Sequence, residues 1–282
     1  MHTPSSFCPD WATALLNGFS QVVLQRHPLC GLCCLLAILV GAPQLLGGAL
    51  LGAASGLLTA QRRGYLRAHR QAGLYSYNGV LIGLLFSHGL PLTLTLPLLI
   101  IAASGLSSLL LARWLKHCAR PTCLPAYTTP FVLAGWALAG VISPLPGAIQ
   151  PFGMADVLTG LGQIFVLGSP VAGALVLLGL IVADRRAALW AVLGSAAGLF
   201  FAGLQGEPPL PGLYGFNPAL AALAFSARPL RAGMAVALAV LLQPGFASLP
   251  LPGLTAPFIL ACWLVRAGSR VLLPEPALHS RR

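Results

Sequence analysis

Residues 73–85, GLYSYNGVLIGLL, decide the fold, because they return in altered form as residues 212–224, GLYGFNPALAALA. Each copy keeps an asparagine, Asn78 or Asn217, in the middle of an apolar run. An unpaired polar group costs roughly 2–7 kcal/mol in an apolar environment, so a repeated asparagine needs a partner or a role. The recurrence predicts that the chain is internally duplicated and that each copy holds a polar feature in its interior.

Three more pairs of segments recur in the same order along the chain. GFSQVVLQRHP at 18–28 matches GLGQIFVLGSP at 160–170, LLGAASGLLTA at 50–60 matches VLGSAAGLFFA at 192–202, and TTPFVLAGW at 128–136 matches TAPFILACW at 255–263. The duplication therefore extends over most of the chain. We expect a first repeat over residues 1–146 and a second over residues 147–282.

The composition places the chain in a membrane. Of its 282 residues, 57% are hydrophobic and 7% are charged, whereas soluble domains carry about 25% charged residues. Apolar runs fill most of the length, and several approach the ~20 residues that a membrane-spanning helix requires. We expect an all-α, multi-pass integral membrane protein of the inner (plasma) membrane, in contact with lipid.

Basic residues distinguish equivalent loops of the two repeats. Four arginines lie between residues 62 and 70, whereas the equivalent stretch 203–210 has neither arginine nor lysine. Conversely, Arg185 and Arg186 correspond to neutral residues near Pro43. Because cytoplasmic loops collect lysine and arginine, equivalent loops should lie on opposite faces of the membrane. The two repeats are therefore predicted to be inverted, with both termini in the cytoplasm.

Each predicted repeat consists of five transmembrane helices and one shorter piece. The short pieces, at about 11–24 and 155–167, cannot cross a bilayer and are interpreted as re-entrant half-helices. Such pieces are tolerated only where protein or a watery cavity surrounds them. Inverted repeats with broken helices commonly hold a solute near the bilayer midplane, so we expect a pore at the interface of the repeats.

The ionisable residues argue against several classes of function. All five acidic residues, Asp10, Asp156, Asp184, Glu207 and Glu275, lie outside the apolar runs or at their ends. Proton relays and ion-coupled sites usually use carboxylates or histidines inside the membrane. All six histidines lie in loops or termini, which leaves no nucleophile and base for an enzyme. Membrane topology accounts for the net charge of +11, so nucleic acid is not an expected partner.

Cysteine spacing gives little support for a metal or redox site. The seven cysteines are scattered without matching histidines, and free cysteine commonly behaves as a small hydrophobic residue. We therefore expect the cysteines to be packing residues, and we expect neither a metal ion nor a cofactor.

The polar residues inside the apolar runs are neutral and occur in repeat-related pairs, namely Gln21 with Gln163, Asn78 with Asn217, and Thr128 with Thr255. Such groups suit a small, uncharged solute, because they offset the cost of its desolvation stepwise. Structural roles also remain open, since the glutamines could satisfy helix termini and the threonines could bond within their own helices. We expect the asparagines to support broken helices rather than to contact solute.

These motifs resemble those of the urea transporter family. The resemblance rests on GFSQVV and GLGQIF, on LYSYNGVL and LYGFNPAL, and on TTPF and TAPF, and it covers about residues 18–266. It implies a homotrimer in which every subunit has its own pore, with passive, channel-like passage of urea.

The resemblance also implies a filter of apolar slots with hydrogen-bonding edges. Carried over by motif position, the substrate-binding residues are Gln21, Val22, Tyr77, Leu81, Thr128, Gln163, Ile164, Phe216, Leu220 and Thr255. The threonines would narrow the middle of the pore, and the aromatic and leucine side chains would form the slot walls. A planar urea molecule would offer its faces to these walls and its N–H donors to the edges.

Two departures from the family pattern keep other functions open. Leu24 and Val166 stand where an aromatic wall is expected in at least one half, and Tyr77 has a hydroxyl where phenylalanine is usual. A wider or wetter first slot would admit related neutral solutes such as short amides or ammonia. An ion-coupled urea carrier and a non-transporting membrane scaffold are the alternatives from other classes.

Overall fold

The computed structural model describes residues 10–118, 123–141, 153–206 and 213–272. Their regular elements are all helical, and no strand occurs among them. The first half contains α1 (Asp10–Val22), α2 (Pro28–Gly41), the short 3-10 helix η1 (Pro43–Leu45), α3 (Leu46–Arg62), α4 (Arg67–Gln71), α5 (Tyr77–Gly89), α6 (Thr95–His117) and α7 (Thr129–Ala137). The second half contains α8 (Met154–Gln163), α9 (Pro170–Ala183), α10 (Arg185–Leu204), α11 (Phe216–Ala224), α12 (Pro229–Ala247) and α13 (Ala256–Leu272).

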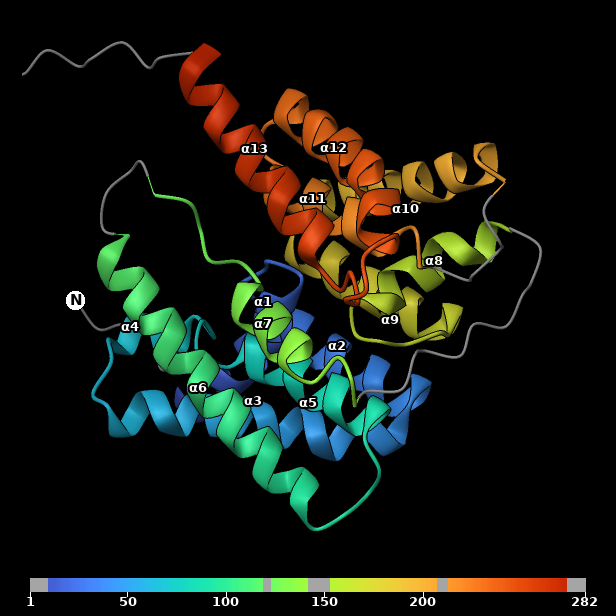
Figure 1. Cartoon of the computed structure of the whole chain (residues 1–282). Coiled ribbons are helices and arrows are strands. Elements are labelled where there is room, and N and C mark those ends of the chain that lie inside the picture. The colour runs from blue at the N-terminus through green and yellow to red at the C-terminus, as the bar shows by residue number, and fades with distance from the viewer. Residues whose placement is uncertain (1–9, 119–122, 142–152, 207–212, 273–282) are drawn as a thin grey trace, which may run out of the picture.

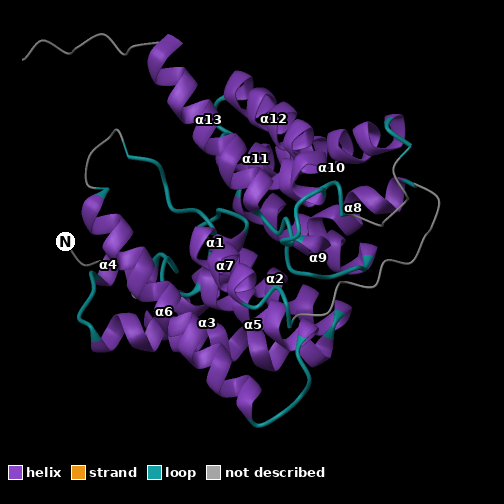
Figure 2. Ribbon diagram, viewed as in Figure 1, coloured by secondary structure: helices purple, strands orange, loops and turns teal. Residues whose placement is uncertain are grey.

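The lengths and surfaces of the helices are those of a membrane protein. Four helical stretches are long and apolar enough to cross a bilayer: Pro43–Arg62, Thr95–His117, Arg185–Leu204 and Pro229–Phe246. Large hydrophobic side chains lie exposed along these helices, among them Leu98, Phe200 and Leu241. Exposed apolar surface on this scale marks a contact with lipid or with another protein. The prediction of an all-helical membrane protein is confirmed (Figure 2).

Some predicted spans are shorter than a bilayer is thick. The helix α5 has 13 residues, and α7 and α11 have 9 residues each. At about 1.5 Å per residue, none of the three reaches across the ~30 Å hydrocarbon core. Positive backbone φ angles lie just before α5, at Gly73, and before α7, at Tyr127, so regular helix cannot extend backwards through either position. These helices therefore begin inside the protein, next to the polar residues that the sequence singled out.

The two halves build the same arrangement from equivalent elements. In the first half α3 packs against α5 and α6, and in the second half α10 packs against α11 and α12. The helix α1 packs against α2 just as α8 packs against α9. Both short helices end in the same turn, with Leu24 at φ 58° and Val166 at φ 61°. Non-glycine residues rarely adopt this left-handed conformation, so its recurrence reflects a shared local structure.

The halves meet where α2 packs against α9 (Figure 1). A Cβ atom built on Gly41, at the end of α2, would lie 2.8 Å from the Cβ atom of Ala172 near the start of α9. One built on Gly179, late in α9, would lie 3.0 Å from the Cβ atom of Cys33, early in α2. The end of each helix therefore faces the beginning of the other, and the two equivalent helices run antiparallel.

Glycines also allow close packing within the first half. A Cβ atom on Gly52 of α3 would lie 2.0 Å from the carbonyl oxygen of Gly79 on α5. One on Gly48 would lie 2.7 Å from the carbonyl oxygen of Gly83, one turn further along α5. Small residues at such crossings let two helix backbones approach closely in a membrane. They hold α5, and with it Tyr77 and Leu81, tightly against α3.

Among the described residues, the cysteines are either free or joined in one disulfide. Cys30, Cys34 and Cys262 are free and buried in the core, as expected of packing residues. Cys118 and Cys123, however, form a disulfide between the end of α6 and the segment that leads to α7. The expectation that every cysteine is a packing residue is therefore wrong for this pair.

Candidate functional site

The hydroxyl groups of Thr128 and Thr255 meet at the centre of the candidate site. Their Oγ1 atoms are 2.7 Å apart although the residues are separated by 127 positions. The side chains are almost fully buried, with 2% and 4% of their surfaces exposed. One hydroxyl donates to the other, so the pair retains one O–H hydrogen and acceptor lone pairs for a further partner. Neither threonine bonds back within its own helix, which was the alternative suggested by the sequence.

Identical local structure places the two threonines. Each stands directly before a helix, α7 or α13, and each carbonyl accepts the first bond of that helix, from Val132 N at 3.0 Å and from Ile259 N at 3.1 Å. The preceding residues, Tyr127 and Leu254, have φ angles of 43° and 44°. The left-handed residue turns the chain sharply into the helix, so each threonine is presented at a helix N-terminus.

Asn217 joins three elements of the second half. Its Nδ2 atom donates to the carbonyl of Leu254 at 3.0 Å and to Oε1 of Gln243 at 3.1 Å. Its Oδ1 atom accepts from the backbone N–H of Phe258 at 3.4 Å. That N–H belongs to the first turn of α13, where it has no partner within the helix. The asparagine thus ties α11 to α12 and to the start of α13, beside Thr255.

Asn78 makes fewer bonds at the equivalent place. Its Oδ1 atom accepts from the backbone N–H of Phe131 at 3.2 Å, in the first turn of α7. Its Nδ2 atom is buried and has no hydrogen-bond partner in the structure. The carbonyl that would correspond to that of Leu254, the carbonyl of Tyr127, accepts instead from the hydroxyl of Tyr77. The two halves therefore share the bond to the helix start but differ in the bond to the preceding carbonyl.

The side chain of Tyr77 is more confined than its sequence position suggested. The ring is buried, and its hydroxyl hydrogen is used on the Tyr127 carbonyl. We expected the hydroxyl to make the first slot wetter, but its donor is directed to the protein and only its acceptor lone pairs remain. Phe216, the equivalent residue on α11, is partly exposed and has no hydroxyl. Leu81 and Leu220 lie one turn further along α5 and α11 and are buried.

The glutamines lie at the ends of the two short helices. The carbonyl of Gln21 accepts from Leu24 N at 3.0 Å, and that of Gln163 accepts from Val166 N, also at 3.0 Å. Both glutamine side chains are partly exposed, while the adjacent Val22 and Ile164 are buried. A helix C-terminus carries partial negative charge, and a carbonyl oxygen that accepts one hydrogen bond keeps a second lone pair. The ends of α1 and α8 therefore suit a solute that donates N–H hydrogen bonds.

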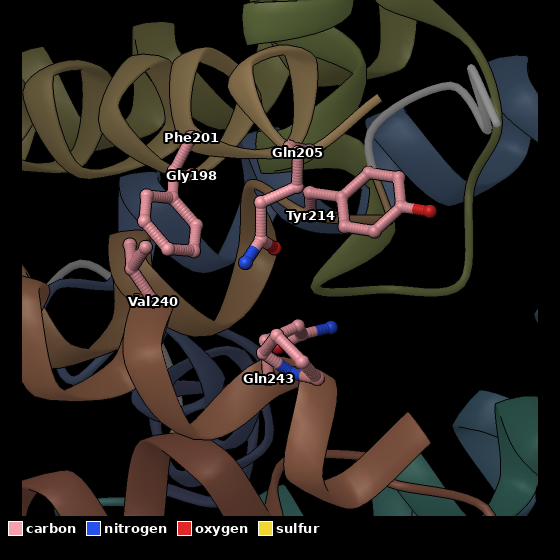
Figure 3. Close-up of a pocket in the computed structure, with 8 residues that line it drawn as sticks. Gly198, Phe201, Gln205, Tyr214, Val240 and Gln243 are labelled. Atoms are coloured by element: carbon pink, nitrogen blue, oxygen red, sulfur yellow. The ribbon is translucent and has the colours of Figure 1, made fainter. Parts of the chain in front are cut away.

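A cavity of about 70 Å³ lies within the second half, between α10 and α12. It is lined by Gln205, Tyr214 and Gln243 together with apolar residues, and Figure 3 shows Gln205 and Gln243 on facing sides of it. Gln243 also donates to the carbonyl of Leu213 at 3.4 Å. Sequence analysis missed Gln243, although a lone glutamine near the end of an apolar run was a signal that it had an internal partner.

Tyr127 is a second residue that sequence analysis missed. Its ring packs edge-on against Phe258, with centroids 5.0 Å apart. Its hydroxyl accepts from Nε of Arg266 at 3.2 Å, and the guanidinium carbon of Arg266 lies 5.5 Å from the centroid of Phe225. A single residue thus supplies the carbonyl that holds Tyr77 and a side chain that holds α13.

Comparison with known proteins identifies the family of the chain. The family model described as "Urea transporter" matches residues 12–270. The chain is 28% identical over 257 residues to "Urea transporter 1" of Ovis aries, and 28% identical over 253 residues to "Urea transporter 1" of Mus musculus. Each alignment covers 76% of this chain and 62% of the relative, so the chain spans less than two thirds of the length of these relatives. With most of its residues matched by the family model, the chain belongs to the urea transporter family.

Proposed function

We propose that the protein conducts urea passively across the inner membrane, through a pore lined by neutral hydrogen-bonding groups. The observation that carries the proposal is the contact between Thr128 and Thr255, whose buried hydroxyls meet at 2.7 Å. Membership of the urea transporter family and the names of the similar proteins support urea as the solute.

The pore would lie between two inverted repeats, over residues 1–146 and 147–282. The antiparallel packing of α2 against α9 supports this arrangement, because a twofold axis parallel to the helices would leave equivalent helices parallel. A twofold axis in the membrane plane also accounts for a threonine meeting its own equivalent. Inverted repeats of transporters commonly hold solute at such an axis, near the bilayer midplane.

The filter would recognise urea by its shape and by its hydrogen bonds. The faces of the planar molecule would lie against Tyr77 and Leu81 on one side of the threonine pair and against Phe216 and Leu220 on the other. Its N–H groups would donate to threonine oxygens at the middle and to the ends of α1 and α8, where Gln21, Val22, Gln163 and Ile164 lie. Each hydrogen bond offsets part of the cost of removing urea from water.

Passive transport is supported by where the acidic side chains lie. Among the described residues these are Asp10, Asp156 and Asp184, and each stands in the first turn or at the N-cap of a helix. Carboxylates there interact favourably with the helix dipole, which gives them a structural role. A proton-coupled or ion-coupled carrier would instead be expected to hold a carboxylate near the solute.

A channel for related neutral solutes is the second candidate. Leu24 and Val166 are partly exposed aliphatic residues, at the turns where an aromatic wall was expected. Aliphatic walls discriminate less strictly by flat shape than aromatic walls do. Formamide and ammonia are the solutes that test this alternative.

We further propose that the chain forms a homotrimer with one pore in each subunit, and that both termini lie in the cytoplasm. The exposed apolar helix surfaces support burial against lipid and against neighbouring subunits. The molecular mass of the purified protein, after correction for bound detergent, tests the number of subunits.

Stopped-flow measurements on proteoliposomes test the transport proposal. Urea should enter vesicles that contain the protein much faster than protein-free vesicles, and an imposed pH gradient should leave the urea flux unchanged. Urea accumulation against its gradient, abolished by a protonophore, would establish a coupled carrier instead. Equal permeability to urea, formamide and ammonia would favour the less selective channel.

A further inference from the structure

A polar pocket lies at the opposite end of α1 from Gln21, where α1 begins beside the end of α3 and the short helix α4. The pocket has a volume of about 160 Å³ and is lined by Asp10, Trp11, Gln61, Arg67, Arg70 and Gln71, together with Ala14 and Leu57. A space of this size holds several water molecules, and so also a phosphate group.

The carboxylate of this pocket already has partners. Asp10 forms an ion pair with Arg67 and accepts a hydrogen bond from Nε2 of Gln71 at 3.0 Å. Each of its oxygens thus has one of these partners, and Arg67 balances its charge. Asp10 is therefore not available to neutralise Arg70, the other arginine that lines the pocket.

Arg70 is the group whose bonding is incomplete. Its Nε atom is buried and has no hydrogen-bond partner among the residues that the structure describes. A buried donor without an acceptor is costly, and more so when the donor is charged. The planar guanidinium matches the oxygens of a phosphate group in geometry as well as in charge. Arg62 and Arg63, at the end of α3, add to the positive charge of this region.

Exposed apolar side chains lie in and near the polar pocket. Trp11, which lines it, has 62% of its surface exposed, and Leu66, next to Arg67, has 67% exposed. Tryptophan favours the headgroup level of a bilayer, and arginines just outside the spans attract anionic lipids. A free phosphate ion would leave Trp11 uncovered, whereas a phospholipid would cover it with its glycerol and upper acyl chain.

We propose that this pocket binds the phosphodiester of an anionic phospholipid, with Arg70 as its main ligand and Trp11 against the apolar part of the lipid. The site is separate from the pore, and the proposal holds whichever solute the pore conducts.

The test is the thermal unfolding midpoint of the purified full-length protein in detergent, titrated with short-chain phosphatidylglycerol, phosphatidylcholine or inorganic phosphate. Phosphatidylglycerol should raise the midpoint of the parent saturably, and the other two should not. Arg70→Gln should weaken the apparent affinity for phosphatidylglycerol roughly fivefold, and Trp11→Ala should weaken it as well. Arg113→Gln is the matched control, since it removes the same charge from an exposed position on α6 outside the pocket.

Three results would overturn the proposal. An equal response to phosphatidylcholine would show that the headgroup charge is irrelevant. An equal response to inorganic phosphate would identify a free-anion site. An equal loss of affinity for phosphatidylglycerol in Arg113→Gln would show diffuse electrostatic attraction rather than a binding site. If Arg70→Gln fails to fold, Arg70→Lys replaces it, since lysine keeps the charge but loses the planar fork and should still bind more weakly than the parent.

Discussion

The hydroxyl of Tyr77 donates a hydrogen bond to the backbone carbonyl of Tyr127, 50 residues further along the chain. In the second half the equivalent carbonyl, that of Leu254, accepts from the side-chain amide of Asn217 at 3.0 Å. The same structural need is met by a hydroxyl in one half and by an amide in the other. The amide of Asn78 is consequently left without a partner.

Replacing Tyr77 with phenylalanine should therefore cost little stability. The ring is retained, and the freed carbonyl of Tyr127 can accept from Nδ2 of Asn78, as the second half does with Asn217. We expect Tyr77→Phe to lower the free energy of unfolding by less than about 1 kcal/mol, the net value of one ordinary hydrogen bond. Unfolding of the detergent-solubilised protein measures this. A loss of several kcal/mol would mean that Asn78 cannot replace the hydroxyl.

Replacing Thr128 or Thr255 with valine should slow urea permeation. Valine keeps the shape but removes the hydroxyl, so a desolvated urea N–H would lose a partner worth about 1–3 kcal/mol. If this loss of hydrogen-bond free energy raises the transport barrier, permeability should drop about tenfold or more, because ~1.4 kcal/mol corresponds to one decade in rate.

Thr59→Val is the matched control for both threonine variants. Its hydroxyl bonds to the carbonyl of Ser55 within α3, away from the threonine pair, so its removal should leave the flux near that of the parent. Stopped-flow urea uptake at matched protein density compares the variants. If both Thr128→Val and Thr255→Val keep the urea flux of the parent, the threonines do not contact urea in the pore.

The two asparagines should differ in their importance for stability. Asn217→Leu would leave two acceptors and the N–H of Phe258 without a partner, whereas Asn78→Leu would leave only the N–H of Phe131 unpaired. With about 1–3 kcal/mol for each buried group left unpaired, Asn217→Leu should destabilise the protein substantially more. The unfolding midpoints of the two variants in one detergent provide the comparison. Equal midpoints would contradict the asymmetry of the hydrogen bonds.

Engineered cysteines test whether the repeats are inverted. Arg63 and Gln205 cap the C-terminal ends of α3 and α10, which are equivalent helices. In a background without native cysteines, Arg63→Cys should react with a membrane-impermeant thiol reagent only from the cytoplasmic side, and Gln205→Cys only from outside. Labelling of both from the same side would refute the inverted arrangement.

The repeated motifs allowed much of the fold to be predicted, because apolar length and duplication are visible along the chain. They also led to Thr128 and Thr255, whose contact follows from their equivalent positions. Gln243 and Tyr127 could not be found in this way, since each acts on residues distant in sequence and neither is repeated as the same residue type in the other half. The short α4 and its ion pair with Asp10 likewise depend on where α1 begins.

The contact of α2 with α9 resembles the interface of a symmetric homodimer, in which one surface meets a copy of itself and any substitution appears twice. Here both helices belong to one polypeptide, so each crossing point can change alone. Gly41 meets Ala172 at one crossing, while the residues at the equivalent positions are Ala183 and Cys30. Covalent joining of the halves thus permits each crossing to be fitted separately, a freedom that a dimer of identical chains does not have.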